Sequence, residues 1–469
     1  MASNNQFDVA IIGGGPGGYT AAFRAAQLGM NVALVEIFKL GGVCLHAACI
    51  PYKALLENVR VINLFRRREE FGITGGGEEI DFGKIMDRKN SVINRLHEGL
   101  QLLVKKNGVT YLEGLGSLTA ADRVRVRNLK TRSEQEIAAK NVIVATGSKP
   151  KFIPAFAADG QRILFSDHIV DLKEVPKSLA ILGGGPIGVE TATVFNALGT
   201  EITILEAMPR IMINEDEEIS FELARRLKEK GINVITEAKV SGVQKMDDSV
   251  RLQFTDAAGR ENALPAQKFL VAIGRDGLVS GLGLENLGVE VERNFIKVNE
   301  KMQTNVPGVY AIGDVVGPPL LAHKAAAEGI LAVETMTGMD SPRVDYNKIP
   351  HCTYCEPQVA SIGLREDEAK EKKGYDVKVG RFSFKISGKA LCEGEEDGFV
   401  KIVSDGRTGE LLGAHMIGHE VTELVMECSE AMFAENTLYE LTRAIYAHPT
   451  RSEAIKEAAL DVNKEAINK

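Results

Sequence analysis

Short apolar runs separated by a glycine turn open the chain. Residues 8–12 are an apolar run of the kind that forms a buried strand of a parallel sheet, and a glycine-rich turn and an alanine-rich helix follow. A second apolar run, residues 31–35, ends in an acid. Strand, glycine turn, helix, strand and acid in this order predict a Rossmann-type dinucleotide-binding unit. Its candidate binding residues are Gly13, Gly15, Gly18 and Glu36.

The same pattern recurs in residues 179–206, so the chain is expected to hold two dinucleotides. In each unit the first glycine permits a tight turn, the second lets a pyrophosphate approach the backbone, and the third lets the helix pack on the sheet. A glutamate at the ribose position, in place of an arginine, favours NAD over NADP in the second unit. Arg210 could weaken this preference, although an exposed arginine there is more often only a solvated charge. The second unit's candidate residues are Gly183, Gly185, Gly188 and Glu206.

Two cysteines, Cys44 and Cys49, directly follow the first unit. In a regular helix, residues five apart lie about 7.5 Å apart along the axis. A disulfide prefers a Cα separation of about 5.5 Å, so the pair can close only where the chain is irregular, and we expect it at the first turn of a helix around residues 53–59. A structural disulfide is one alternative, but large enzymes more often use close cysteine pairs for metal or redox chemistry. Metal binding is the weaker of these because no second ligand pair at a zinc spacing accompanies the cysteines, so no metal site is expected.

Two further apolar runs suit a nucleotide-binding protein. Residues 142–147 predict a strand that ends in a glycine turn and crosses between domains. Residues 308–314 predict a buried strand ending in Asp314, which could bind a cofactor hydroxyl, cap a helix, or do both. From about residue 347 onward, strand-like runs alternate with amphipathic helices and no nucleotide signal is present. This pattern predicts a separate α+β domain.

A histidine and a carboxylate lie close together near the end of the chain. His448 is five residues before Glu453, across a proline turn, so the carboxylate could hold the imidazole in one tautomer for use as a base. On spacing alone this is a weak signal, because a lone histidine is more often a structural hydrogen-bond donor. The catalytic and the structural reading therefore both remain open at this point.

Composition narrows the class of protein. The 469 residues carry a net charge of −8, which favours neither nucleic acid nor an anionic membrane as a partner. No window approaches a membrane span, and the N-terminus lacks the basic start and apolar core of a secretory signal. Six cysteines in a chain of this length do not form a disulfide scaffold. We therefore expect a cytoplasmic protein in a reducing compartment.

Taken together, the motifs resemble those of the flavin disulfide reductases, and within them they are most similar to the dihydrolipoamide dehydrogenases. The resemblance rests on the two dinucleotide units, the cysteine pair and four short motifs, at residues 145–147, 274–275, 311–314 and 448–453. It implies a homodimer with an α/β fold: two Rossmann-like dinucleotide-binding domains and a C-terminal α+β dimerisation domain. The implied domains are residues 1–147 for FAD, 148–275 for NAD, 276–346 completing the FAD site, and 347–469 for the interface.

The resemblance also implies roles for individual residues. Cys44 would exchange with the substrate dithiol, and Cys49 would face the flavin. His448, oriented by Glu453, would be the base and would reach the dithiol site of the other subunit. Lys53 and Glu190 match the two members of a charged pair beside the flavin, in which the cation stabilises reduced flavin. The implied FAD-binding residues are Gly13, Gly15, Gly18, Glu36, Gly42, Lys53, Gly116, Thr146, Gly147, Asp314 and Ala322, and the implied NAD-binding residues are Gly183, Gly185, Gly188, Glu190, Glu206, Val240 and Gly274.

The activity implied is oxidation of dihydrolipoyl groups through a Cys44–Cys49 disulfide and FAD, with reduction of NAD+ to NADH. The implied partners are the lipoyl domains of 2-oxoacid dehydrogenase complexes or the H protein of the glycine cleavage system. Two alternatives remain: a related reductase acting on another disulfide, and a non-catalytic flavoprotein that serves as a docking subunit. The chain departs from the usual pattern at His46, Ala48, Tyr52, Gly277 and Tyr446. These departures put the disulfide substrate in doubt, but not base catalysis.

A second close cysteine pair, Cys352 and Cys355, lies in the expected interface domain. A pair with this spacing can be redox-active, but no flavin signal accompanies it. We interpret it as buried packing.

Overall fold

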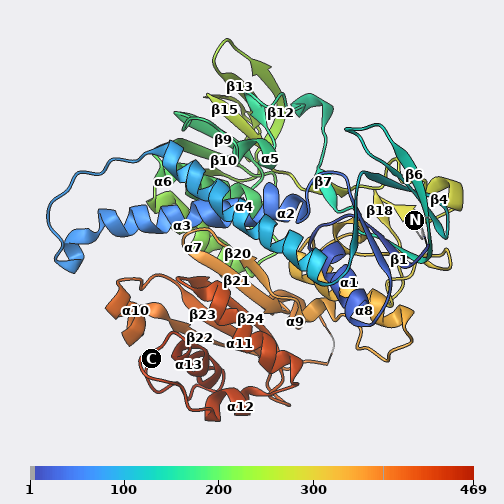
Figure 1. The fold of residues 1–469 in the computed structure, drawn as a ribbon. Coiled ribbons are helices and arrows are strands. Elements are labelled where there is room, and N and C mark those ends of the chain that lie inside the picture. Colours follow the sequence, from blue (N-terminus) through green and yellow to red (C-terminus); the bar gives the residue numbers. More distant parts are fainter. Residues whose placement is uncertain (1–5, 373) are drawn as a thin grey trace. The chain divides into compact units, whose positions relative to one another are not determined.

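The computed structural model describes residues 6–372 and 374–469, and Figure 1 shows its fold. The chain divides into two compact units, each assembled from segments that are far apart in the sequence. Each unit has hydrophobic cores of its own. Unit 1 consists of the described residues up to 54, 83–152 and 273–344, and unit 2 consists of residues 55–82, 153–272 and 345–469.

A seven-stranded sheet forms the centre of unit 1, in the order β3-β2-β1-β6-β5-β4, with β19 paired to β6. Strands β1, β2, β3, β6 and β19 run parallel, whereas β5 and β4 extend the sheet in antiparallel fashion. Because parallel strands end at the same edge, the turns after β1, β2 and β19 lie near one another. The strands are β1 (Gln6–Ile12), β2 (Val32–Glu36), β3 (Thr110–Glu113), β4 (Leu115–Ala120), β5 (Arg123–Arg127), β6 (Glu134–Val144) and β19 (Val309–Ala311).

The helices of unit 1 lie between and after the strands of its sheet in the sequence. Helix α1 (Pro16–Gln27) packs against α8 (Ala322–Met336), and the contact requires glycine, because a Cβ on Gly329 would lie 2.7 Å from the Gly17 carbonyl oxygen. Two consecutive helices follow β2, the five-residue α2 (Gly42–His46) and α3 (Cys49–Arg66). The long helix α4 (Phe82–Lys106) then leads into β3.

Unit 2 contains a second parallel sheet, in the order β11-β10-β9-β15-β8, and an antiparallel three-stranded sheet, β12-β13-β14. Helices α6 (Pro186–Ala197) and α7 (Glu217–Glu229) belong to the parallel layer. The sequence analysis predicted β9 and β10, the two strands of the repeated pattern, but neither the other parallel strands nor the antiparallel ones. The strands are β8 (Ile163–Leu164), β9 (Ser178–Leu182), β10 (Glu201–Leu205), β11 (Asn233–Ile235), β12 (Lys239–Lys245), β13 (Val250–Thr255), β14 (Glu261–Ala266) and β15 (Lys268–Val271).

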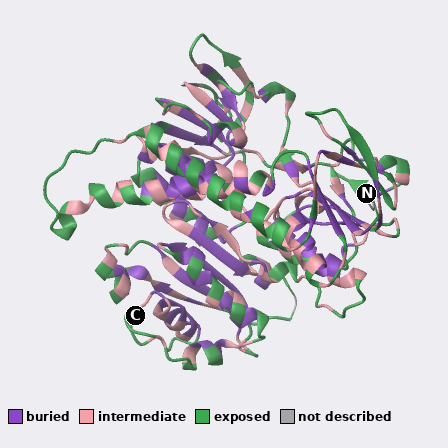
Figure 2. Cartoon of the chain, in the orientation of Figure 1, coloured by how far each residue is buried: buried purple, intermediate pink, exposed green. Residues whose placement is uncertain are grey.

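The C-terminal part of unit 2 is a five-stranded antiparallel sheet in the order β20-β21-β24-β23-β22. Helices α11 (Val421–Phe433) and α13 (Glu453–Asp461) pack on this sheet, and alternate strand residues such as Ile402 and Met416 form the core with them. The central strands are buried along their length (Figure 2). The strands are β20 (His351–Thr353), β21 (Gln358–Gly363), β22 (Val377–Ser383), β23 (Phe399–Asp405) and β24 (Leu411–Gly418).

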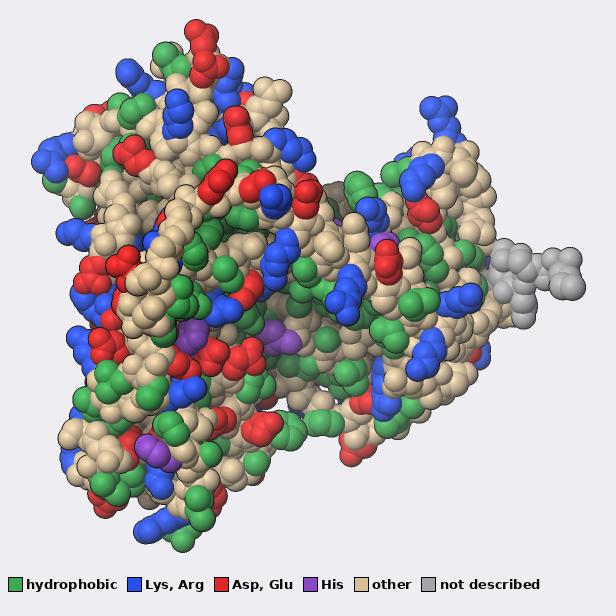
Figure 3. Space-filling view, turned by 60° about the vertical axis from the view of Figure 1, so that its left-hand side comes forward, with side chains coloured by type: hydrophobic (Ala, Val, Ile, Leu, Met, Phe, Trp, Pro, Cys, Tyr) green, Lys and Arg blue, Asp and Glu red, His purple; other side chains and the backbone are tan. Residues whose placement is uncertain are grey.

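This architecture confirms the predicted fold class, an α/β chain with two parallel-sheet nucleotide-binding units and a C-terminal α+β part. Acidic and basic side chains are intermingled on the face shown in Figure 3. Within the described residues, none of the helices is both long and apolar enough to cross a membrane. The remaining short elements are η1 (Arg68–Phe71), β7 (Ser148–Pro150), η2 (Pro154–Phe156), α5 (Ser166–Ile169), β16 (Arg275–Gly277), η3 (Glu285–Leu287), β17 (Val291–Glu292), β18 (Phe295–Ile296), η4 (Gly313–Val316), η5 (Tyr346–Lys348), α9 (Glu366–Glu371), η6 (Phe384–Ile386), α10 (Gly388–Glu393) and α12 (Leu438–Arg443).

Candidate active site

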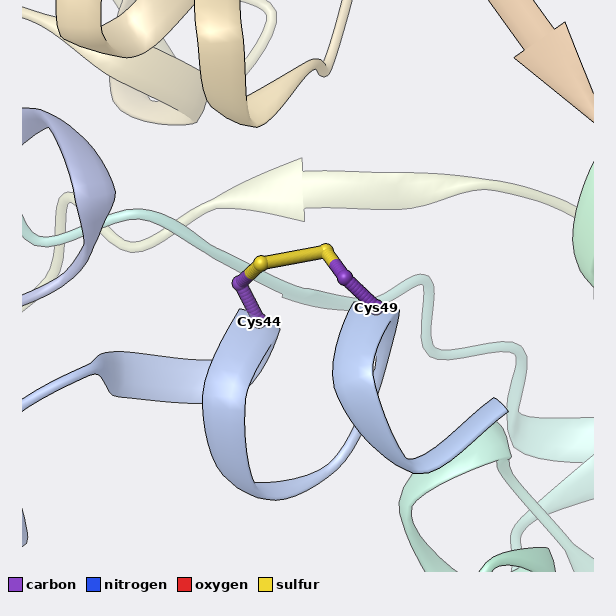
Figure 4. The surroundings of a disulfide bond; sticks show 2 residues. All are labelled: Cys44 and Cys49. Atoms are coloured by element: carbon purple, nitrogen blue, oxygen red, sulfur yellow. A yellow bond between two sulfur atoms is a disulfide. The ribbon is translucent and has the colours of Figure 1, made fainter. Parts of the chain in front are cut away.

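A disulfide joins Cys44 and Cys49 (Figure 4). Cys44 lies in α2 and Cys49 begins α3, and the chain leaves helical geometry between them, at Ala47. This break brings the two Cα atoms to 4.7 Å, closer than a continuous helix would allow. The expectation of an irregular segment at the start of a helix is therefore confirmed. The sequence analysis did not predict that Cys44 has a short helix of its own.

The disulfide loop is attached to the first glycine turn. The amide of Gly41 donates to the carbonyl oxygen of Gly14 (2.8 Å). A Cβ on Gly42 would lie 2.9 Å from the Cα of Gly15, so glycine permits this close approach. The redox pair is thus held within unit 1 at the turn that the sequence assigns to a dinucleotide.

The first glycine turn has the shape that a pyrophosphate requires. A Cβ on Gly18 would lie 1.9 Å from the Gly13 carbonyl oxygen, which explains why α1 can pack so closely on the turn. A Cβ on Gly15, in contrast, would meet no atom of the described residues within 4 Å. The first turn of α1 contains no acid, and within the described chain no side chain caps it. Its free amides and its helix dipole therefore suit a phosphate.

The second glycine turn repeats these features in unit 2. A Cβ on Gly188 would lie 2.0 Å from the Gly183 carbonyl oxygen, and one on Gly185 would meet nothing among the described residues. Helix α6 likewise begins without an acid in its first turn and without a capping side chain in the described part. The residues of both turns therefore fit a dinucleotide.

The two predicted ribose acids have matching positions. Glu36 accepts hydrogen bonds from the amides of Gly14 (2.7 Å) and Phe38 (2.8 Å). Glu206 accepts them from Gly184 (2.6 Å) and Met208 (2.8 Å). Each carboxylate is thereby fixed beside its glycine turn, while its remaining lone pairs can accept from hydroxyl groups.

Arg210 is bound to the backbone rather than solvated. Its guanidinium donates to the carbonyl oxygens of Met212 (3.3 Å) and Glu215 (2.8 Å). The interpretation of Arg210 as a solvated charge is therefore wrong. Both of these bonds are made by Nη1, and the choice between NAD and NADP stays a prediction.

Asp314 lies in a polar chain at the end of β19. It accepts a hydrogen bond from the hydroxyl of Ser148 (2.5 Å), and Ser148 accepts one from Arg275 (2.8 Å). The N-cap position of η4 is Ile312, so the interpretation of Asp314 as a helix cap is wrong. The sequence analysis did not identify Ser148 or Arg275 as parts of this chain, because their contacts join segments more than a hundred residues apart.

A buried ion pair on α8 supports the turn that carries Asp314. Lys324 donates to the carbonyl oxygens of Gly313 (3.0 Å) and Gly317 (2.8 Å), and Glu328 accepts from the Gly313 amide (2.7 Å). The two side chains also lie 3.3 Å apart. The sequence analysis missed this pair. Two opposite charges four residues apart in an otherwise apolar helix were the available signal.

The other predicted cofactor residues lie in both units. Lys53 lies on α3 in unit 1, and Glu190 is buried on α6 in unit 2, where it accepts from the Tyr354 amide (2.9 Å). Their pairing beside a flavin stays a prediction. Thr146 donates to the Leu278 carbonyl oxygen (2.8 Å). The rest are Gly116 on β4, Gly147 before β7, Ala322 at the start of α8, Val240 on β12 and Gly274 before β16.

His448 and Glu453 meet as predicted. The Nδ1 atom of His448 lies 2.9 Å from Oε1 of Glu453, and the side chain of His448 is 78% exposed. Burial by itself raises the pKa of Glu453, but hydrogen bonds from the Thr450 amide and from His448 lower it below its usual value. The carboxylate therefore stays ionised and can stabilise an imidazolium, while Nε2 faces outward.

The first departures from the resembled pattern, at His46 and Tyr52, lie in unit 1. Within unit 1, His46 and His97 both approach the carbonyl oxygen of Leu40, at 2.9 and 3.0 Å. Burial, His97 and Lys39 lower the pKa of His46 despite that hydrogen bond. Tyr52 is buried.

Tyr446 is the departure nearest the predicted base in sequence. Burial, Glu427 and Cys428 raise its pKa to about 12, so it is a neutral phenol. Two residues before His448, the surface therefore carries a neutral, half-buried phenol instead of an imidazole.

The second cysteine pair has the character of packing. Cys352 and Cys355 are not joined by a disulfide, and their sulfur atoms approach different carbonyl oxygens, those of Thr422 and Pro357. Within the described residues we find no cluster of three or more side chains able to hold a metal ion.

Comparison with known proteins assigns the chain to a family. A model of the pyridine nucleotide-disulphide oxidoreductases matches residues 7–329, and a model of the dimerisation domain of the same family matches residues 349–459. The chain belongs to the pyridine nucleotide-disulphide oxidoreductase family. It is 42% identical to a dihydrolipoyl dehydrogenase of Bacillus subtilis over 99% of both chains, and 43% identical to one of Chlorobaculum tepidum over 97% of both.

Two solved structures of similar fold cover nearly the whole chain. LpdA of Mycobacterium tuberculosis superimposes with a TM-score of 0.89 at 25% identity, over 96% of this chain and 98% of that one. RclA of Escherichia coli, a HOCl-induced flavoprotein disulfide reductase solved as a Cu(II) complex, superimposes with a TM-score of 0.86 at 26% identity, over 97% and 99%. The fold therefore extends over nearly the whole chain in both.

Family membership establishes the general chemistry. The protein is a flavin disulfide oxidoreductase with Cys44–Cys49 as its redox disulfide. The family binds FAD and uses NAD(P). The dimerisation domain supports a homodimer.

Proposed function

We propose that this protein is a dihydrolipoyl dehydrogenase that uses NAD+. The observation that carries the proposal is the joint presence of a closed Cys44–Cys49 disulfide and an exposed, carboxylate-oriented His448 in a chain about 42% identical, over its full length, to dihydrolipoyl dehydrogenases. Two features support NAD over NADP. The side chain of Arg210 is bound to a backbone carbonyl oxygen, and Glu206 stands at the position expected to bind a ribose hydroxyl.

The proposal assigns cofactors to segments. Residues 1–147 and 276–346 bind FAD, residues 148–275 bind NAD, and residues 347–469 form the interface of a homodimer. The disulfide loop held against the first glycine turn supports the FAD assignment. The open Gly185 and the uncapped start of α6 support the NAD assignment. The partners are lipoyl domains of 2-oxoacid dehydrogenase complexes or the glycine cleavage H protein.

The mechanism follows from the residues of the chain. Nε2 of His448 of the partner subunit takes the proton from one thiol of the dihydrolipoyl group, and Glu453 beside it stabilises the imidazolium. The resulting thiolate attacks the sulfur of Cys44, which breaks the bond to Cys49 and leaves a Cys49 thiolate and a mixed disulfide. The second substrate thiol then attacks the mixed disulfide, releases oxidised lipoyl product and leaves Cys44 reduced. FAD, held at the first glycine turn, would supply the two-electron chemistry that links the reduced dithiol to NAD+.

A related reductase with another disulfide substrate is the second candidate. Its support is the neutral Tyr446, two residues before His448, and the buried Tyr52 and partly buried His46 near the cysteines in sequence. The similar fold of RclA also supports it. These side chains would change the approach to Cys44 without removing the redox disulfide.

An anaerobic titration separates the two candidates. The purified holoenzyme is titrated with dihydrolipoamide and then with NAD+, and its visible spectrum is recorded. We expect a long-wavelength thiolate-to-flavin band on two-electron reduction, followed by formation of NADH. If NADH produces that band and dihydrolipoamide leaves the oxidised spectrum unchanged, lipoamide is not the substrate and the second candidate replaces the first.

A further inference from the structure

The loop that carries His448 is attached to the rest of the C-terminal domain by a buried arginine. Only 6% of Arg451 is exposed. Its Nε and Nη2 atoms both donate to Oε2 of Glu393 on α10 (3.0 and 2.8 Å), and Nη2 also donates to the Glu395 carbonyl oxygen (3.0 Å). The guanidinium also lies over the ring of Phe384, 5.2 Å from its centroid. Arg451 thus meets three partners that lie outside the loop.

The loop itself is closed by short bonds around the predicted base. Glu453 accepts from His448 through Oε1 and from the Thr450 amide through Oε2 (2.9 Å each). The Thr450 hydroxyl donates to the Ala447 carbonyl oxygen (2.8 Å). Because these bonds lie within residues 447–453, a movement of the loop would carry the histidine and the carboxylate together. Contacts that leave the loop are what position this pair in the domain.

The Arg451–Glu393 contact can hold the loop firmly because its arginine side is shielded from water: the side chain of Arg451 is 6% exposed and that of Glu393 is 26% exposed. Burial by itself raises the pKa of Glu393, but Lys389 and Arg451 lower it overall, so the carboxylate is ionised. The Nη1 atom of Arg451 is buried and makes no hydrogen bond within the described residues. The charge of the guanidinium therefore depends strongly on Glu393, and loss of Glu393 would leave a buried charge uncompensated.

We propose that Arg451 is a positioning residue for the His448–Glu453 pair: its bonds to Glu393 and Glu395 anchor the loop and set the orientation in which His448 exchanges protons with the dithiol. The inference rests on the proposed function, because His448 accepts a proton from the substrate only if a dithiol is oxidised. The step that it affects is the first proton transfer, from the substrate thiol to Nε2.

The chain offers a matched control for this anchor. Lys389 forms an ion pair with the same Glu393 (2.9 Å), but it lies on the same helix as Glu393 and 39% of its side chain is exposed. Arg451→Met removes the anchor while keeping an apolar side chain of similar length, and Lys389→Met removes only the exposed partner. Glu393→Gln breaks the anchor from the other side and serves if Arg451→Met does not fold.

Two activities of the holoenzyme separate positioning from general damage. Reduction of NAD+ by dihydrolipoamide needs His448, whereas reduction of ferricyanide by NADH through the flavin does not. We expect Arg451→Met and Glu393→Gln to lower dihydrolipoamide turnover between about tenfold and a hundredfold, as small misplacements of catalytic groups do. Ferricyanide turnover should stay within about twofold in these variants, and Lys389→Met should change neither activity.

The split between kcat and KM adds a readout that a purely structural role would not move. Because the His448–Glu453 bond lies within the loop, losing the anchor displaces the pair as a unit. Arg451→Met and Glu393→Gln should therefore lower kcat for dihydrolipoamide more than they raise KM, and Lys389→Met should change neither. Equal loss of both activities, or unchanged dihydrolipoamide turnover in folded variants, overturns the proposal. If the wild type does not oxidise dihydrolipoamide, the proposed function fails, and the NMR chemical shifts of the His448 ring in the wild type and in Arg451→Met still test whether Arg451 positions it.

Discussion

Lys401 is the residue whose removal should destabilise the C-terminal part of unit 2 most clearly. It lies on β23, its side chain is 2% exposed, and its ammonium group contacts both carboxylate oxygens of Asp216 (2.9 and 2.8 Å). It also contacts Glu218 (2.8 Å) and Glu366 (2.7 Å). Asp216 is buried too, and its carboxylate caps α7 by accepting from the Glu218 amide (3.1 Å). Lys401→Met therefore removes the cation that lies among three carboxylates.

The expected cost follows from which carboxylate is left without a partner. Glu218 and Glu366 keep Arg381, at 2.5 and 3.3 Å, so most of the loss falls on Asp216. Breaking a buried ion pair by removing one partner costs about 3–5 kcal/mol, because a charge remains in a medium that solvates it poorly. Lys370→Met is the matched control: Lys370 pairs with Glu366 (2.6 Å) but is 59% exposed. Exposed pairs contribute less than about 1 kcal/mol.

Urea unfolding followed by far-ultraviolet circular dichroism measures the difference. We expect the transition of Lys401→Met to move to much lower urea, and that of Lys370→Met to stay near the wild type. Adding Asp216→Asn to Lys401→Met should recover part of the loss, because asparagine keeps the helix cap and carries no charge. If Lys401→Met unfolds like Lys370→Met, or if Asp216→Asn brings no recovery, the stranded-charge argument is wrong.

Three further predictions concern pH, the base and the glycine turns. Burial raises the pKa of Glu215 to about 7. Between about pH 4.5 and 7 the folded protein therefore holds a proton that the unfolded chain has lost. As the pH rises through this window, the free energy of unfolding of the wild type should fall relative to that of Glu215→Gln, by up to about 3 kcal/mol. Urea unfolding at pH 5, 6, 7 and 8 checks this, and a difference that does not change with pH contradicts it. His448→Gln should lower dihydrolipoamide oxidation about 10²–10⁴-fold while NADH-driven ferricyanide reduction persists; a parallel loss of both would argue against its role as base. Gly188→Ala places a Cβ 2.0 Å from the Gly183 carbonyl oxygen and should lower thermal stability, whereas Gly185→Ala meets no described atom and should weaken NADH binding without lowering stability. Calorimetric unfolding and NADH titration of both variants test this, and equal stability losses would refute it.

Much of the candidate site was predictable because its signals are local. A glycine turn between a buried strand and a helix, followed by a strand that ends in an acid, has few other interpretations, and the structure places Glu36 and Glu206 alike. The contact of His448 with Glu453 spans five residues, so a proline turn is enough to bring them together. The sequence showed that the chain must leave helical geometry between the two cysteines, but not that it does so at Ala47.

Misread residues share a different physical origin. Arg210 looked like a solvated charge because its backbone partners depend on how the turn after Glu206 folds. For Asp314 only the alternative of a helix cap was wrong, because Ile312 holds the N-cap position. Its bond with Ser148 left no local signal, since Ser148 reaches it from a strand 166 residues away in sequence. Arg451 drew no attention inside its motif because Glu393 meets it from a separate helix.

The sequence by itself determined the fold class, the two glycine turns, the redox cysteines and the pairing of His448 with its carboxylate. These features depend on the spacing of apolar residues and on the freedom of glycine, which act within one or two elements. Only the tertiary structure decided which buried charges meet. Lys401 reaches Asp216 across 185 residues of sequence, and Arg451 reaches Glu393 across 58. Such pairs form because a charge removed from water must find an opposite charge wherever packing brings one, and short stretches of sequence carry no record of that packing.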